Sequence, residues 1–191
     1  NEFVDTTDQS TEGQGSPIIR PQRHFDTLIY SGNGSTTQNI TGLEFKPDFV
    51  WIKSRSSGSG HHSLIDSVRG DVASNSNSQI AEYGVSAFNI NDNNSIDVPY
   101  YNNDYSMNTN SATYVAWCWK AGGNSNTFNV DGVGYATATA AGLTDGTITP
   151  TGSSVGTKQG FSIIKYTGNG GSNQYVPHGL NETPVIIWHK N

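Results

Sequence analysis

The sequence contains an internal repeat, and this repeat limits the architectures open to the chain more than any other feature. The segment FDTLIYSGNGSTTQNITGLEFKPDFVWIK, which starts at Phe25, returns from Phe161 as FSIIKYTGNGGSNQYVPHGLNETPVIIWHK, with one inserted residue. Phe25 matches Phe161, and Trp51 matches Trp188. We therefore expect a modular protein with one full unit and the opening strands of a second, and a polypeptide that continues beyond Asn191.

The composition favours strands and turns and argues against several partners. Charged residues make up only 14% of the chain and hydrophobic residues 33%, and there are 22 glycines. The net charge is −6 and there is no run of Lys or Arg, which argues against nucleic acid as a partner. No apolar run approaches the roughly 20 residues of a membrane helix, so we expect no membrane insertion. The one cysteine, Cys118, excludes an intramolecular disulfide.

Changes in local pattern divide the chain into four parts. Residues 1–23 are polar and aperiodic, as in an extended arm or linker. Residues 24–123 carry short β-rich runs separated by turn clusters and are predicted to form a β-sandwich unit. Residues 124–159 are rich in Gly, Thr and Ala and read as a connector with at most weak hairpins. Residues 160–191 are the first strands of a second, incomplete unit.

The strand pattern predicts an all-β sandwich or jelly roll. Residues 31–35, SGNGS, are predicted to form a type I′ hairpin turn. The apolar run at 49–53 implies cover on both faces, and residues 114–121 alternate most clearly. Further short strands are expected at 62–68, 87–90 and 95–98. The predicted core comprises large side chains of these strands: Phe25, Ile29, Phe49, Trp51, Leu64, Val115, Trp117 and Trp119.

No catalytic motif is found in the sequence. A nucleophile elbow is absent, and the best polar cluster is HHSLIDSVRG, with His61, His62, Asp66 and Arg69. We interpret it as a hydrogen-bonding and ion-pair set that fixes the turn at Gly70, because half-buried Asp and Arg normally pair. Catalysis is the alternative interpretation. We expect no enzymatic activity and no cofactor.

An Asn- and Asp-rich segment raises the question of a metal site. Residues 91–97, NDNNSID, offer the oxygen ligands that calcium prefers, but they lack the spacing, the central Gly and the terminal Glu of an EF-hand loop. A solvated Asn-rich turn is the preferred interpretation, with calcium binding as the alternative. We predict no metal site.

A tyrosine-rich segment is the best candidate for a binding surface. Tyr100, Tyr101, Asn103 and Tyr105 combine aromatic faces, which stack on the C–H side of a sugar ring, with an amide that can meet its hydroxyls. These residues are the predicted receptor- or glycan-binding site. The alternative is a tyrosine-rich loop that packs on its own sandwich or on a neighbouring chain.

The motifs taken together resemble a known repeated domain. The succession YSGNGSTTQNITGLEFKPDFVWIKSR, SLIDSVRG, SATYVAWCWKAGG and GFSIIKYTGNGGSNQYVPHGLNETPVII is similar to the repeated β-domain of virion proteins of marine tailed phages, particularly those that infect cyanobacteria. The likeness covers about residues 24–123 and 160–191. It implies a lectin-like sandwich in tail-fibre-like or other surface-exposed structural proteins, and it brings no catalytic residues. Between Phe88 and Tyr114 the chain departs from the pattern, because Asn- and Tyr-rich sequence replaces an expected Gly-Phe turn.

The expected function is that of a non-enzymatic virion structural protein. We expect a tail-fibre or appendage segment that forms homo-oligomers, contacts other virion proteins and touches the host surface, with a surface glycan as the candidate receptor. Its expected location is the virion, in the tail or another external appendage. The alternatives are a carbohydrate-binding module of a larger adhesin or enzyme, and a head decoration protein. A glycan depolymerase would need paired carboxylates that we cannot place in the sequence.

Overall fold

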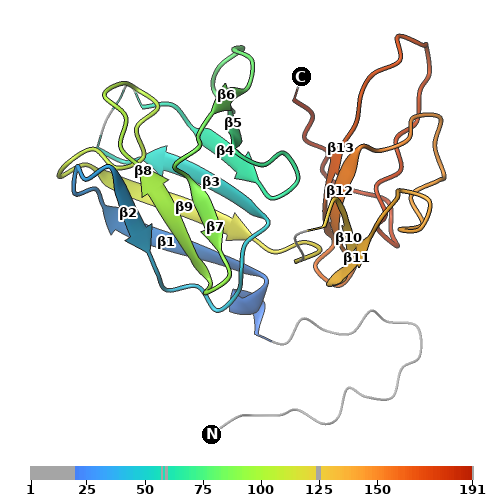
Figure 1. Cartoon of the computed structure of the whole chain (residues 1–191), viewed down its shortest axis with the longest axis horizontal. Coiled ribbons are helices and arrows are strands. Elements are labelled where there is room, and N and C mark those ends of the chain that lie inside the picture. Colours follow the sequence, from blue (N-terminus) through green and yellow to red (C-terminus); the bar gives the residue numbers. More distant parts are fainter. Residues whose placement is uncertain (1–19, 57, 59, 124–125, 191) are drawn as a thin grey trace, which may run out of the picture.

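The computed structural model is an all-β protein with two lobes (Figure 1). It describes residues 20–56, 58, 60–123 and 126–190. Most of the predicted arm, residues 1–23, lies outside the described residues. The one helical element described is a short 3-10 turn, η2 (Pro21–Arg23), just before the first strand. No described helix is long and apolar enough to cross a membrane.

The first lobe is a sandwich of two antiparallel sheets, as the sequence predicts. Sheet A has the order β1 (Phe25–Ser31), β9 (Thr113–Trp119), β3 (Phe49–Ser54), β4 (Ser63–Asp66), β5 (Val72–Asn75) and β6 (Tyr83–Gly84). Sheet B has the order β2 (Thr37–Ile40), β8 (Ser95–Pro99) and β7 (Asn89–Asn91). Strand β9 lies between β1 and β3 and pairs with both, so two segments far from it in the sequence flank it.

The sandwich core lies on the opposite face of sheet A from the predicted one. Ile29 is 68% exposed and Phe25 41% exposed, and the predicted core residues of β3 and β9 are only half-buried. Of the eight predicted residues, Leu64 alone is buried. The core side chains of sheet A are instead those of the alternate positions, Leu28, Tyr30, Val50, Ile52, Tyr114, Ala116 and Cys118. They pack against Ile40, Ile96 and Val98 of sheet B.

Strand alternation explains both what the prediction achieved and where it went wrong. Successive side chains of a strand point to opposite faces, so the pattern sorts residues into two sets without saying which set meets the second sheet. We assigned the larger aromatic set to the core. In the structure Tyr30 and Tyr114 stack inside with ring centroids 5.1 Å apart. The hydroxyl group of Tyr30 donates to the carbonyl of Met107 at 2.9 Å, so its polar end is satisfied within the core.

The predicted hairpin at residues 31–35 is also wrong. Gly34 does have a positive φ of 72°, as the Asn-Gly pair suggested. However, β1 pairs with β9 in sheet A while β2 pairs with β8 in sheet B, so this turn carries the chain from one sheet to the other. The side chain of Asn108 holds it there, donating to Asn33 Oδ1 at 3.0 Å and to the carbonyl of Ser35 at 2.8 Å.

The second lobe is built largely from the predicted connector. The chain there forms a four-stranded sheet C in the order β11 (Val133–Tyr135), β10 (Phe128–Val130), β12 (Gly152–Gly156) and β13 (Phe161–Lys165). The pairing of β10 with β12 is parallel, and the other two pairings are antiparallel. A small separate core contains Phe128, Ala138, Leu143 and Val155. The prediction of a connector with at most weak hairpins therefore missed a sheet, because its strands are short and glycine-rich.

The second copy of the repeat forms only its first strand. β13 is the counterpart of β1 and keeps the same side-chain alternation, since Ile164, at the position of the buried Leu28, packs on the second core. Residues 184–190, the counterpart of β3, are not in a strand.

Candidate functional site

The outer face of sheet A carries five large aromatic side chains, which we call the aromatic face: Phe25, Phe49, Trp51, Trp117 and Trp119. The register of the sheet aligns them in two rows. Phe25, Trp119 and Phe49 lie side by side across β1, β9 and β3, and Trp117 and Trp51 form the next row. Aromatic residues on one face of adjacent strands form stabilising cross-strand pairs.

Ring contacts hold the aromatic face together. The centroid of Trp119 lies 4.9 Å from that of Phe25 and 5.3 Å from that of Phe49, and Trp51 and Trp117 are 5.3 Å apart. All three pairs are tilted, a geometry that aromatic pairs prefer over a flat sandwich. Such a surface is larger than scattered exposed apolar residues, and surfaces of this kind mark contacts with another molecule or module.

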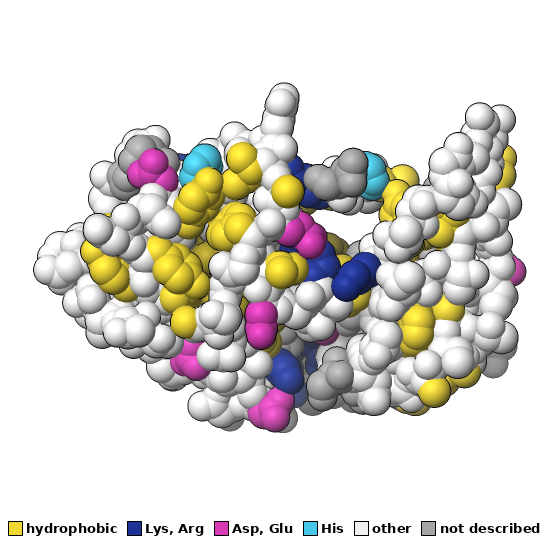
Figure 2. Space-filling view, turned by 45° about the horizontal axis from the view of Figure 1, so that its top comes forward, with side chains coloured by type: hydrophobic (Ala, Val, Ile, Leu, Met, Phe, Trp, Pro, Cys, Tyr) yellow, Lys and Arg dark blue, Asp and Glu magenta, His cyan; other side chains and the backbone are white. Residues whose placement is uncertain are grey.

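The second lobe covers part of this face with the matching residues of the repeat. Trp188 packs edge-on against Trp51 with centroids 5.1 Å apart, and Phe161 lies 6.0 Å from Phe49. Trp188 is the counterpart of Trp51, and Phe161 is the counterpart of Phe25. The two copies thus meet through one pair of equivalent positions, Trp51 and Trp188, and Phe161 adds a contact with the neighbouring position Phe49. Figure 2 shows the two lobes side by side with an opening between them.

A buried carboxylate joins the two lobes beside the aromatic face. Asp48 is almost fully buried, and its Oδ2 accepts hydrogen bonds from the backbone N–H of Ala121 at 2.7 Å and of Gly123 at 3.0 Å. Its Oδ1 accepts from the hydroxyl group of Ser67 at 2.9 Å and from that of Ser154, in β12, at 2.8 Å. The carboxylate is therefore fully occupied by the protein, which leaves it a structural role.

The cluster around Asp66 and Arg69 has the structural arrangement that we preferred. Asp66 Oδ1 accepts from the backbone N–H of Val68 and of Arg69, and the guanidinium of Arg69 donates to Asp66, Glu82, Ser74 and the carbonyl of Leu64. Burial alone would lower the pKa of Arg69, but Asp66 and Glu82 raise it above its ordinary value. The turn that follows places Gly70 at a φ of 80°, which favours glycine.

His62 does not belong to this cluster, although the sequence analysis grouped it with Asp66 and Arg69. Its ring lies 6.3 Å from that of Trp51, at the border of the aromatic face. Burial, then the charge of Lys53 and the neighbouring His61, lower the pKa of His62.

The predicted receptor residues differ in how far they are exposed: Tyr100 and Asn103 are exposed, and Tyr101 and Tyr105 are half-buried. Tyr105 is held between two rings, with centroids 4.8 Å from His61 and 4.6 Å from Tyr83. Burial raises the pKa of Tyr101, which packs on the sandwich core. The Oδ1 atom of Asn103 accepts a hydrogen bond from the backbone N–H of Tyr105 at 3.0 Å.

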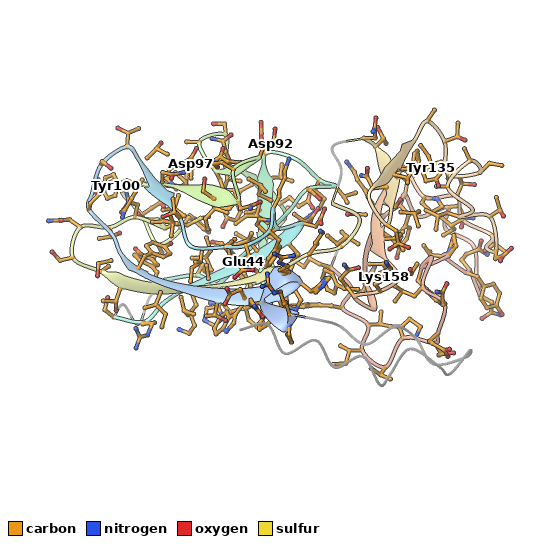
Figure 3. All side chains as sticks on the ribbon, turned by 90° about the horizontal axis from the view of Figure 1, so that it is seen from below. Glu44, Asp92, Asp97, Tyr100, Tyr135 and Lys158 are labelled. Atoms are coloured by element: carbon orange, nitrogen blue, oxygen red, sulfur yellow. The ribbon has the colours of Figure 1, made fainter. Side chains whose placement is uncertain are left out.

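Tyr100 is the member of the set that offers its ring to solvent. It is 37% exposed, and Figure 3 places it at the end of the sandwich remote from the second lobe. Its hydroxyl group lies 3.4 Å from Asn102 Oδ1. Receptor or glycan binding by these four residues stays a prediction.

The Asn-rich segment at 91–97 is the turn between β7 and β8. Ser95 Oγ donates to Asn93 Oδ1 at 2.6 Å and accepts from the amides of Asn39 and Asn91, so these groups satisfy one another. Among the described residues there is no group of three or more His, Cys, Asp or Glu side chains placed to hold a metal ion.

The sequence analysis did not identify the aromatic face as a contact surface, and it did not identify Asp48 as a residue that links the two lobes. The signal for the first was present, because the repeat conserves large aromatic residues at Trp51 and Trp188. No sequence signal connects Asp48 with Ser154, which lies 106 residues further on.

Comparison with known proteins gives one family. Residues 20–191 match the family model described as "Domain of unknown function (DUF7483)". No curated protein and no solved structure matches the chain.

Proposed function

The chain belongs to the DUF7483 family, and we propose that it is a non-enzymatic structural segment of a phage virion. In this proposal it forms part of a tail fibre or another external appendage, in which repeated sandwiches pack on one another and self-associate. The appendage contacts other virion proteins and the host surface. This places the chain outside the cell, in the particle.

The packing of equivalent repeat positions is the observation that carries the proposal. Trp51 meets Trp188, its own counterpart, across the two lobes. A surface that recognises a copy of itself suits a protein built from successive modules, because each added module presents the same face again. The resemblance of the WIKSR, DSVRG and AWCWKAGG motifs to repeated phage virion domains supplies the location.

The absence of catalytic function is part of the same proposal. Cys118 is the one thiol, and burial, then the charge of Asp26, raises its pKa to about 12. A thiol of that pKa is protonated at neutral pH and is a poor nucleophile. Asp48 and Asp66, the buried carboxylates, have their oxygens occupied by backbone, hydroxyl or guanidinium donors.

Immunogold electron microscopy of the phage that encodes the chain tests the location. Antibodies against residues 20–191 are expected to decorate intact particles at the tail or an appendage. The control is the same labelling of particles from an unrelated phage grown on the same host. Antigen that is abundant in infected cells but absent from purified particles would refute the proposal.

A second candidate, carbohydrate binding, is favoured by the exposed ring of Tyr100. A flat ring with a neighbouring amide, Asn102, offers stacking and hydrogen bonding to a sugar. Glycan-array binding by the purified chain that is lost in Tyr100→Ala and kept in Tyr100→Phe would support this role. Binding that survives Tyr100→Ala would exclude this surface.

A further inference from the structure

β13 has one edge that no strand of the described chain occupies. It pairs with β12 on one side and ends sheet C on the other. The backbone N–H of Ser153 donates to Thr127, next to β10, so the neighbouring residues of β12 direct their backbone groups toward β13. Ser154 therefore pairs with Ile163 through the ladder, and Ser162 and Ile164 direct their N–H and C=O groups to the open edge.

The first copy of the repeat shows what such an edge binds. Lys120 donates its backbone N–H to the carbonyl of His24, so the alternate residues Asp26 and Leu28 of β1 face β9. Asp26 and Leu28 are the counterparts of Ser162 and Ile164. The open edge of β13 is thus the same edge that β1 uses to bind β9.

The counterpart of β3 is equally without a neighbour. In the first copy β3 lies on the other side of β9, and Val50 is fully buried. Its counterpart Ile187 is 81% exposed. The second copy therefore contains the strand that corresponds to β1 and the residues that correspond to β3, whereas the described residues contain no second strand of the β9 kind.

We propose that β13 and residues 184–190 form a docking site for one further β-strand, which enters antiparallel to β13 as β9 does beside β1. The occupant has the chemistry of β9. Small or sulfur-containing side chains, like Ala116 and Cys118, face inward over Ile164 and Ile187, and aromatic side chains face outward. Main-chain hydrogen bonds supply the affinity and the alternation supplies the specificity, as in other cases of β-strand addition.

The aromatic contacts already described fit this occupant. Trp188 and Phe161 lie on the outer side, against Trp51 and Phe49, so the outer face of the second sheet is already oriented against the first lobe. Tyr166 Oη lies 2.9 Å from His189 Nε2, and the centroids of the two rings are 6.2 Å apart. Their counterparts Tyr30 and Ile52 lie on the two strands that flank β9.

Amide hydrogen exchange with a synthetic strand tests the proposal. The ¹⁵N-labelled full chain is mixed with a peptide that has the sequence of residues 111–121 under reducing conditions. Exchange at Ser162 and Ile164 is expected to slow by about tenfold or more at saturating peptide. Exchange at Ile163 and Lys165 should change little, because their backbone groups already face β12.

Two matched controls separate strand addition from adhesion to apolar surface. A peptide N-methylated at Ala116 keeps its side chains but lacks the N–H that would pair with Ile164, and it should give no slowing. The chain variant Ile187→Asp should bind the unmodified peptide about tenfold or more weakly. Unchanged amide hydrogen exchange at Leu28 and Ala116 in the Ile187→Asp variant would show that the first sandwich of this variant remains folded.

Three results would overturn the proposal. The first is unchanged exchange at Ser162 and Ile164 with saturating peptide. The second is equal slowing by the N-methylated peptide. The third is slowing that depends on protein concentration without any peptide, which would identify a second copy of this chain as the occupant.

Discussion

Substitution of Asp48 is the sharpest test of how the two lobes are joined. Asp48→Ala removes the acceptor of two backbone N–H groups, those of Ala121 and Gly123, and of the hydroxyl groups of Ser67 and Ser154. A buried donor without a partner costs about 1–3 kcal/mol, and at least two of these donors are buried. We expect Asp48→Ala to lower the free energy of unfolding by about 3–5 kcal/mol.

Asp48→Asn should cost much less, for a reason specific to this geometry. The backbone N–H groups of Ala121 and Gly123 have fixed directions and both point at Oδ2, where the amide oxygen of Asn can stand. The amide NH₂ group then faces the hydroxyl groups of Ser67 and Ser154, which can rotate to accept. The expected loss is about 1–2 kcal/mol, because two hydroxyl hydrogens lose their acceptor.

Urea unfolding followed by far-UV circular dichroism measures these free energies, and Asp92→Ala is the matched control. Asp92 has a side chain that is 94% exposed and pairs only with Lys46, so its removal should change stability by no more than about 0.5 kcal/mol. The reasoning fails if Asp48→Ala behaves like this control. It also fails if Asp48→Asn is as damaging as Asp48→Ala, because the hydroxyl groups would then not adapt.

Three further predictions concern the first lobe. Ile52→Ala, in the observed core, should lower the free energy of unfolding by about 2–5 kcal/mol, and Trp117→Ala on the half-buried aromatic face should lower it less. If urea unfolding gave the reverse order, the core would lie on the face of sheet A that was predicted from the sequence. Cys118 should react with a thiol reagent at pH 8 only after the protein unfolds, because with a pKa of about 12 only about one thiol in ten thousand is ionised. Rapid labelling of the folded protein would contradict this prediction. Arg69→Lys should lower the free energy of unfolding by about 1–3 kcal/mol, because an ammonium group cannot reach Asp66, Glu82 and the carbonyl of Leu64 together. An unchanged urea midpoint would show that the several hydrogen bonds of the guanidinium group are dispensable.

The all-β class and several of the strands could be predicted because they depend on local information. Alternation identifies a strand such as β9 without any knowledge of its neighbours, and the pairing of Asp66 with Arg69 follows from their proximity in the chain. The short strands β10 and β12 could not be identified. β12 consists largely of glycine and serine, which have low strand propensity, β10 is only three residues long, and the parallel pairing between them is a tertiary contact.

The site was less predictable than the fold, for a related reason. The ring of Tyr105 packs against those of His61 and Tyr83, which are 44 and 22 residues away in the sequence, and only the folded chain brings them together. Composition correctly identified a tyrosine-rich segment, but the availability of a ring face is a property of packing. Tyr100 keeps its exposed ring because it lies at the far end of the sandwich.

The misplaced core also explains why the repeat carries its largest side chains where it does. The interior of the first lobe combines small side chains, such as Val50 and Ala116, with the stacked rings of Tyr30 and Tyr114, and it contains no tryptophan. The large indole rings lie on the other face, where a single sandwich would expose them to water. Trp51 packs on Trp117 of its own copy, and the second copy of the repeat adds the contact with Trp188. Because an uncovered aromatic patch favours association, the sequence that forms one module also makes that module incomplete on its own.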